Sequence, residues 1–358
     1  MKTLFLSTLT AISGYFIIII FMPILKKIAK RINLIDKPNA RKIHQDPVPL
    51  IGGIAIAASF FTSSLINPDI LNSIVQQITI YSTAVVLLIL GILDDRFDIS
   101  AKYKLIIQLT CAFAVSYSGI RITSFYGLFG INEIPYYMQY VITILIITGV
   151  VNAINLMDGI DGLLGEMAII GFSVLIIVAI VQGNYTLAVM YSAFVGAVFG
   201  FLKFNLNKHE IFMGDAGALF LGNILIGSTI YLLNSKTNTQ LSQQIIVFSF
   251  IGFFSIPVLD SLRVYLGRLK NGKSPFKADK THLHHLLLLF GISHKRIALI
   301  ISLLSASVLL FCLISIQLIS VSGIVVVILV IFSLLSLILN LNKKVTDWQE
   351  RVKQMEVL

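Results

Sequence analysis

Charged residues are scarce in this sequence, and their scarcity excludes a soluble globular protein. Asp, Glu, Lys and Arg make up only 12% of the 358 residues, whereas 57% are hydrophobic and the mean hydropathy is +0.92. An average soluble domain carries about 25% charged residues. The composition therefore indicates a chain that crosses a membrane several times.

Cysteine is also rare, since the chain has only two, Cys111 and Cys312, and both fall in apolar runs. They read as small hydrophobic residues, which excludes a disulfide framework and a cysteine-based metal site. No ionisable residue lies at the centre of a hydrophobic run, and no internal repeat is visible. Ion-coupled transporters usually carry an ionisable residue in the middle of a span, and many are built from internal repeats. The absence of both therefore argues against transport.

The hydrophobic runs predict an all-α polytopic membrane protein with about 11 transmembrane helices. The first run is too long for a signal-peptide core and lacks a small-residue cleavage pattern, so we expect it to remain as a helix. One integral membrane domain, 1–342, would be followed by a cytoplasmic tail, 343–358, either an amphipathic interfacial helix or a frayed polar segment. Residues 120–135 are expected to form a small hairpin. The expected spans are 4–25, 50–66, 74–93, 103–119, 136–154, 163–181, 186–203, 216–233, 244–262, 295–318 and 322–341.

The distribution of positive charge predicts the orientation. Of the 27 Lys and Arg residues, all but Lys2, Arg121 and Lys236 fall in the segments that an 11-span chain places on one side. Because cytoplasmic loops are enriched in Lys and Arg, the N-terminus is expected outside and the C-terminus in the cytoplasm. The net charge of +10 is then explained by orientation and not by nucleic-acid binding.

The most unusual stretch is polar and lies between two apolar runs. In residues 152–164, Asn152, Asn155, Asp158 and Asp161 recur at every third position, with no Lys or Arg among them. A helical segment would place the first three along one face, and Gly159 and Gly162 predict a break. Such oxygen-bearing groups suit Mg²⁺ with a phosphate substrate, although a plain polar turn would also account for an Asp-Gly pair.

Two further acidic positions fall at the same side of the membrane. Asp94 and Asp95 are adjacent at the end of a span, where they repel each other unless a bound cation, or Lys102 and Lys104, offsets their charge. Asp215 stands between two glycines at the start of another span. A helix N-terminus there could offer backbone N–H groups to an anion, and Asp215 could hold Mg²⁺ or cap the helix itself.

Basic and imidazole groups complete the pattern. The first loop, residues 26–49, carries seven Lys and Arg residues, which suit lipid headgroups or phosphates. Three of the six histidines, His282, His284 and His285, fall within four residues. Zn²⁺ binding is conceivable, but nearby Lys and Arg residues, Arg268 among them, would repel a dication, so phosphate contact fits better. The residues therefore indicate phosphoryl chemistry between a water-soluble phosphate compound and a lipid.

Five motifs in order resemble those of the polyprenyl-phosphate N-acetylhexosamine-1-phosphate transferases and cover nearly the whole chain. They are Asp36-x-Pro-x-x-Arg41-Lys42-x-His44 with Pro47-x-Pro49-x-x-Gly52-Gly53; Asp94-Asp95 with Ser100-Ala101-Lys102-Tyr103-Lys104; Asn152 to Leu163; Asn205 ten residues before Asp215 in Phe212-Met213-Gly214-Asp215; and Ser274-Pro275-Phe276 with His282-Leu283-His284-His285.

The resemblance implies a reaction and its partners. Undecaprenyl phosphate and a UDP-N-acetylhexosamine, most simply UDP-GlcNAc, would give undecaprenyl-pyrophosphoryl-HexNAc and UMP, at the cytoplasmic face of a bacterial inner membrane. This is the first membrane step toward an envelope polymer such as lipopolysaccharide O-antigen or teichoic acid. The His-x-His-His form resembles the GlcNAc-1-phosphate branch, because the phospho-MurNAc-pentapeptide branch usually has three consecutive histidines. The resemblance also implies a homodimer through membrane helices.

Site roles follow from the resemblance by position. Asn155 and Asp215 would bind Mg²⁺, for which Mn²⁺ could substitute. Asp94 would deprotonate or position the lipid phosphate, with Asp95 and Asp158 in the same catalytic group. The residues expected to contact the nucleotide sugar and its phosphates, or to order the metal site, are Lys42, His44, Lys102, Asn152, Asp161, Asn205, Arg268, His282, His284 and His285.

Three alternatives stay open at this point. The first is a phospho-MurNAc-pentapeptide transferase, which the interrupted histidine run disfavours. The second is a transporter or flippase for a lipid-linked sugar, which the missing mid-membrane charge disfavours. The third is a zinc-dependent membrane hydrolase that uses the three clustered histidines.

Overall fold

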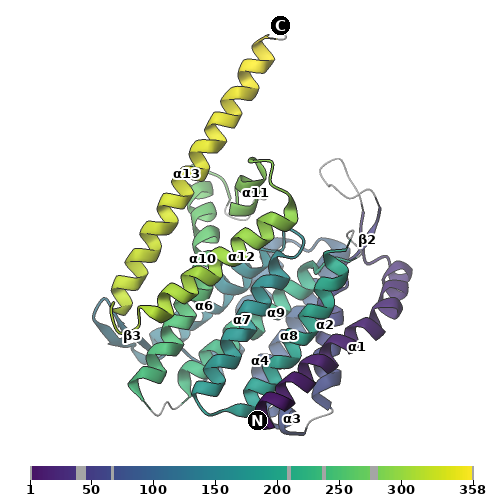
Figure 1. The fold of residues 1–358 in the computed structure, drawn as a ribbon, viewed down its shortest axis with the longest axis vertical. Coiled ribbons are helices and arrows are strands. Elements are labelled where there is room, and N and C mark those ends of the chain that lie inside the picture. The colour runs from purple at the N-terminus through teal and green to yellow at the C-terminus, as the bar shows by residue number, and fades with distance from the viewer. Residues whose placement is uncertain are drawn as a thin grey trace.

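The computed structural model describes residues 2–37, 46–65, 68–207, 211–235, 239–274 and 281–356, and almost all of its regular structure is helical (Figure 1). The helices are α1 (Lys2–Ile32), α2 (Gly52–Leu65), α3 (Pro68–Gln76), α4 (Ile78–Phe97), α5 (Ala101–Tyr117), α6 (Tyr136–Asn155), α7 (Leu163–Val181), α8 (Tyr185–Asn205), α9 (Gly214–Asn234), α10 (Gln240–Lys270), α11 (Leu283–Leu288), α12 (His294–Ile314) and α13 (Val321–Glu356). Four short strands are β1 (Ile35–Asp36), β2 (Val48–Pro49), β3 (Ser124–Leu128) and β4 (Ile131–Glu133).

The predicted all-α polytopic class is confirmed. Within the described ranges, nine helices are long and apolar enough to cross a membrane, or ten if the sharply bent pair α2 and α3 counts as one span. The remaining predicted span, 103–119, corresponds to α5, which has 17 residues. Each of the eleven predicted spans therefore coincides with a helix or with this bent pair.

The last span begins within one residue of its predicted start but ends much later than predicted. The prediction ended this span at residue 341, but α13 continues without a break to Glu356. The tail is therefore helical and not frayed, and Figure 1 shows it extending well beyond the other helices. The expected hairpin is also present, formed by the antiparallel pair β3 and β4.

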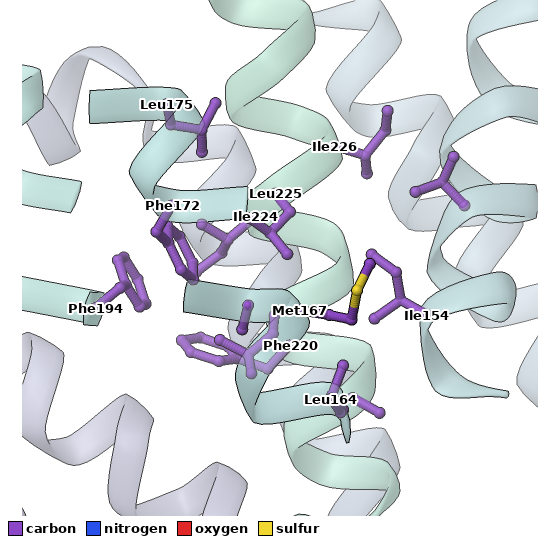
Figure 2. Close-up of a cluster of buried hydrophobic side chains, with 14 of the residues drawn as sticks. Ile154, Leu164, Met167, Phe172, Leu175, Phe194, Phe220, Ile224, Leu225 and Ile226 are labelled. Carbon is purple, nitrogen blue, oxygen red and sulfur yellow. The ribbon is translucent and has the colours of Figure 1, made fainter. Parts of the chain in front are cut away.

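Helix α9 is the centre of the bundle. Of its 21 residues, 18 are buried, and it packs against α2, α4, α6, α7 and α10. Figure 2 shows its side chains Phe220, Ile224 and Leu225 among residues of neighbouring helices, including Phe172 and Phe194. The rings of Phe172 and Phe194 are stacked with centroids 4.4 Å apart. A helix that is apolar on all sides suits this central position.

Glycines allow three helices to touch backbone to backbone near the start of α9. A Cβ added at Gly53 would lie 2.2 Å from the Cα of Gly217, and one added at Gly91 would lie 2.3 Å from the Cα of Ala216. Real Cβ atoms do not approach other atoms so closely, so larger residues would push the helices apart. The first turn of α9 is thereby held beside α2 and the end of α4.

The segment before α9 is also tied to the first loop. Phe212 donates its N–H to the carbonyl of Pro49 at 2.9 Å, and Gly52 donates to the carbonyl of Phe212 at 2.9 Å. Gly53 then donates to the carbonyl of Met213 at 3.1 Å. Two motifs about 160 residues apart in the sequence therefore meet, and they meet at the end of the bundle that carries α11 and β2 (Figure 1).

Candidate active site

The acidic residues predicted from separate loops come together around the first turn of α9. Asp94, in the last turn of α4, is buried, with 8% of its surface exposed. Its Oδ2 lies 2.6 Å from the Nζ of Lys104, and its Oδ1 accepts the backbone N–H of Ile99 at 2.8 Å. The same Nζ lies 3.4 Å from Oδ2 of Asp215. Lys104 therefore links the carboxylates of α4 and α9.

The neighbouring carboxylate, Asp95, points in a different direction. Its Oδ1 accepts the backbone N–H of Asp215 at 3.0 Å, and its Oδ2 accepts that of Ala216 at 3.3 Å. Asp95 thus caps the N-terminus of α9 from a neighbouring helix. The expectation that Asp215 caps its own helix is wrong, because the acceptor comes from α4. The expectation that these N–H groups await a substrate anion is also wrong, since Asp95 occupies them.

The polar segment 152–164 forms a helix end followed by a turn. Helix α6 ends at Asn155, and Asp158 donates its backbone N–H to the carbonyl of Asn155 at 3.1 Å in the turn. Asp158 therefore does not continue a helical face with Asn152 and Asn155, because the helix ends three residues before it. The Asn152 amide donates to Gln108 Oε1 at 2.6 Å. The Asn155 side chain is half-buried and has no hydrogen bond to any residue in the described ranges.

Asp158 lies in a strongly negative environment. Burial raises its pKa well above the usual value for an aspartate, and the charges of Asp215, Asp95 and Asp161 raise it further. The backbone N–H of Gly214 donates to Asp158 and opposes this rise only in part. A cation bound at this turn would lower that pKa and relieve the repulsion between the clustered carboxylates.

Asn205 joins the turn to the segment before α9. Its Oδ1 accepts the backbone N–H of Gly162 at 2.7 Å, and its Nδ2 donates to the carbonyl of Ile211 at 3.0 Å. Gly162 has φ +85°, a conformation that favours glycine. Because the amide of Asn205 is buried and bonded at both ends, the geometry supports an ordering role for it and not direct nucleotide contact.

The histidine segment packs against the same turn. A Cβ added at Gly159 would lie 2.5 Å from Nε2 of His284, so only glycine fits under this ring. His284 is 2% exposed. Burial lowers its pKa to about 3, helped by neighbouring His285 and His282. His284 is therefore neutral at physiological pH, and any phosphate contact it makes would use an N–H group and not a positive charge.

Asp260 anchors this segment to α10. Its Oδ2 lies 3.0 Å from Nδ1 of His282, and its Oδ1 accepts an N–H of Arg263 at 2.6 Å. The backbone N–H of Leu283 donates to both carboxylate oxygens at 3.2 Å. Arg263 also donates to the carbonyl of Thr281 at 2.6 Å. Through these bonds one buried carboxylate fixes the start of α11 and the orientation of the His282 ring.

Not every predicted residue joins the cluster. Lys102 is exposed, in the first turn of α5, and Arg268 is buried, with its guanidinium 5.8 Å from the centre of the Tyr265 ring. Asp161 and His285 are half-buried near the turn, and the rings of His285 and His284 are 4.2 Å apart. Lys42 and His44 lie outside the described residues.

Three site residues were not assigned from the sequence. Lys104 was expected, like Lys102, only to offset the charge of Asp94 and Asp95 and was not placed among the site residues, whereas it contacts both Asp94 and Asp215. For Asp260, the only indication in the sequence was an acidic residue near one face of the membrane. Gln108, one turn beyond Lys104 on α5, receives the hydrogen bond of Asn152 and had no signal beyond its polarity in an apolar run.

The donors favour Mg²⁺ over Zn²⁺. In the part of the chain that the structure describes, no three His, Cys, Asp or Glu side chains form a ready metal site. Zn²⁺ sites usually need three or four such ligands, whereas Mg²⁺ commonly takes one or two carboxylates with waters and substrate phosphates. The oxygen donors of Asn155, Asp158 and Asp215 fit the second pattern. Nδ1 of His282 faces Asp260, and the His284 ring packs on Gly159.

Comparison with known proteins gives consistent matches over most of the chain. Residues 77–233 match the family described as Glycosyl transferase family 4. A Bacillus subtilis protein named probable undecaprenyl-phosphate N-acetylglucosaminyl 1-phosphate transferase is 33% identical over 290 residues, which covers 80% of this chain and 78% of that protein. The undecaprenyl-phosphate alpha-N-acetylglucosaminyl 1-phosphate transferase of Escherichia coli K12 is 30% identical over 304 residues, or 82% and 80% of the two chains.

Proposed function

The chain belongs to glycosyl transferase family 4, and from this membership we propose that it transfers GlcNAc-1-phosphate from UDP-GlcNAc to undecaprenyl phosphate. An oxygen of the lipid phosphate attacks the phosphorus that carries the sugar. The bond between the two phosphates of the donor breaks, UMP leaves, and a lipid-linked diphosphate forms. The names of the relatives supply the sugar and the lipid, and they favour this reaction over transfer of phospho-MurNAc-pentapeptide.

One observation carries the proposal: Lys104 stands between Asp94 and Asp215, at 2.6 and 3.4 Å, where three helix ends meet. At this end of the bundle, the positive charge of Lys104 can offset the repulsion between two phosphate groups that are brought together there. A transporter would need a polar pathway through the bundle, whereas α9 at its centre is buried and largely apolar.

The chemistry asks mainly for positioning and charge neutralisation. A lipid phosphate has a second pKa of about 6, so it is already an anionic nucleophile at neutral pH. Lys104 would contact the incoming phosphates, and Asp94 would hold Lys104 in place and accept the remaining proton of the lipid phosphate. The charge that develops on the departing UMP would be met by groups already fixed in the site.

We further propose that the site binds Mg²⁺ through Asn155 and Asp215, with Asp158 beside them. The side-chain amide of Asn155, which has no hydrogen bond to any residue in the described ranges, and the carboxylates clustered around Asp158 support this assignment. When bound, the ion would offset the repulsion between the two phosphate anions and stabilise the leaving UMP. Asp95 and Asn205 would keep the backbone around these ligands in place.

The placement of Lys and Arg supports a cytoplasmic site. The site end of the bundle is the end at which 24 of the 27 basic residues were expected from the sequence, and these residues favour the cytoplasmic side of a bacterial inner membrane. The product would then serve as the first lipid-linked intermediate of an envelope polymer.

An assay with purified protein tests the proposal. UMP release should require both polyprenyl phosphate and Mg²⁺, and in a panel of UDP-sugars UDP-GlcNAc should be used best. Asp215→Asn should abolish release, whereas Asp69→Asn, an exposed position in α3, should not. UMP release without the lipid would indicate a hydrolase, and transfer of phospho-MurNAc-pentapeptide alone would indicate the other branch.

A further inference from the structure

Asp94 and Asp95 are adjacent, yet the structure gives them different partners. Asp94 pairs with Lys104 at 2.6 Å, whereas both oxygens of Asp95 accept backbone N–H groups of α9. We propose that Asp95 is a positioning residue, which sets the first turn of α9 and with it Asp215, and that it touches neither substrate nor metal. The proposed role of Asp95 depends on the proposed function only because enzymatic activity is one of the two measurements that test it.

The first turn of α9 lacks an acceptor of its own. The first four N–H groups of a helix have no partner within the helix. Met213, which precedes α9, provides no side-chain hydrogen bond to it. Asp95 supplies the acceptors for Asp215 and Ala216, and Asp158 accepts from Gly214. Three successive N–H groups are therefore satisfied by carboxylates from outside the helix.

The surrounding backbone leaves Asp95 little freedom to do anything else. Gly214 has φ +73°, and a Cβ there would lie 2.5 Å from Oδ2 of Asp95. Gly91, one turn before Asp95 on α4, touches the backbone of Ala216. A carboxylate held against a helix N-terminus is also partly stabilised by the helix dipole.

The consequence concerns Asp215. Its carboxylate stands 3.4 Å from Lys104, and its backbone position is fixed by the bond from its own N–H to Asp95. If that acceptor is displaced, the first turn of α9 can open and Asp215 moves away from Lys104. The distance between the proposed metal ligand and the cation therefore depends on the Asp95 cap.

Two conservative variants separate a cap from a chemical group. Asp95→Asn keeps one acceptor oxygen at the same reach, enough for one of the two N–H groups, but it loses the charge and replaces the second oxygen with an NH2 group that cannot accept a hydrogen bond. Asp95→Glu keeps the charge but moves it one methylene further, into space that Gly214 already limits. We expect Asp95→Asn to keep kcat/KM within about 10-fold of wild type and Asp95→Glu to lose about 100-fold. The Mg²⁺ concentration for half-maximal activity should stay near the wild-type value in Asp95→Asn and rise in Asp95→Glu.

The reverse order of activities, with Asp95→Glu more active than Asp95→Asn, would overturn the proposal and assign Asp95 to the chemistry or the metal. Amide hydrogen exchange over residues 211–218 gives a readout that does not depend on catalysis. Protection there should fall less in Asp95→Asn, which keeps one of the two acceptors, than in Asp95→Glu, and equal protection in both would also overturn the proposal. If wild type releases no UMP, the proposed function fails, but the exchange result still decides the role of Asp95.

Discussion

The side-chain nitrogen of Lys104 lies 2.6 Å from Oδ2 of Asp94, across the tight turn that joins α4 to α5. The turn is closed by the bond from the N–H of Ile99 to the other oxygen of Asp94. Asp94 is thus held by two groups within ten residues, and Lys104 is left positioned to reach Asp215, 111 residues further along the chain. Through Lys104, this local arrangement connects the carboxylate of Asp94 on α4 with that of Asp215 on α9.

Replacement of Lys104 should abolish most activity. Lys104→Met keeps the bulk of the side chain but leaves Asp94 buried without its cation, and loss of one partner of a buried pair is costly. We expect kcat/KM for UMP release to fall at least ~100-fold, with Lys104→Arg intermediate because its charge is retained in a different geometry. Lys295→Met, at an exposed position on α12, is the control. Full activity in Lys104→Met would contradict the assignment.

Neutralisation of Asp215 should separate stability from activity. Asp215 adds negative charge beside Asp94, Asp95 and Asp158, so Asp215→Asn relieves repulsion and should leave the melting temperature equal or higher. UMP release should nevertheless fall at least ~100-fold if Asp215 binds the metal. Thermal denaturation with and without Mg²⁺ provides the second measurement. Mg²⁺ should raise the melting temperature of wild type but not of Asp215→Asn, and an equal rise in both would place the ion elsewhere.

A methyl group at Gly159 should disturb the histidine segment. The added Cβ of Gly159→Ala would collide with the His284 ring, which is buried and cannot move freely. Overpacking of this kind costs roughly 1–3 kcal/mol, so we expect kcat/KM to fall about 10-fold or more. Gly149→Ala in α6, where nothing lies within 4 Å of the new Cβ, is the matched control.

A double variant checks the cause of that loss. In Gly159→Ala combined with His284→Ala the collision is absent, so the two effects should be less than additive. Strict additivity would show that Gly159 and His284 act independently.

The buried His284 should make the protein sensitive to acid. Its pKa is about 3 in the folded state and about 6.5 in an unfolded chain, so between these values the unfolded state binds more protons. The stability that depends on neutral His284 is complete above pH 6.5 and decreases as the pH falls toward 3. At pH 5 the loss amounts to about 2 kcal/mol.

Unfolding of wild type and His284→Gln between pH 7.5 and 5 measures this term. Other acid-sensitive groups are common to both proteins, so the difference between the two curves isolates His284. Wild type should lose more stability than the variant, and parallel curves would show that His284 is accessible to protons in the folded state.

Composition and hydrophobic run length were enough to predict the helices, because a membrane span has a fixed length and an apolar surface. They also placed Asp94, Asp158 and Asp215 at one end of the bundle, since each stands where a span begins or ends. The predicted span 136–154 also ended within one residue of α6, but the course of the following turn was not predicted, because it is fixed by the hydrogen bond to Asn205 and by packing under His284.

The direction of individual side chains could not be read from the sequence. Lys102 and Lys104 are two residues apart on a helix, which turns about 100° per residue, so they face nearly opposite sides. Only contact with Asp94 shows that Lys104 is the inward one. In the same way Asp94 and Asp95 are separated by about 100°, which directs one carboxylate to α5 and the other to α9. Which neighbour stands on each side is decided by tertiary packing.

The glycine contacts between α2, α4 and α9 divide the site into two mechanically different halves. Where Gly53 meets Gly217 and Gly91 meets Ala216, main chains touch with no side chain between them that could rotate or compress. That half acts as a stiff platform. Accommodation of differently shaped donors must then come from the opposite half, where Asp260 and Arg263 fasten α11 to α10 through side chains. Altered sugar preference should therefore be sought by changing residues of α10 and α11, with the platform left intact.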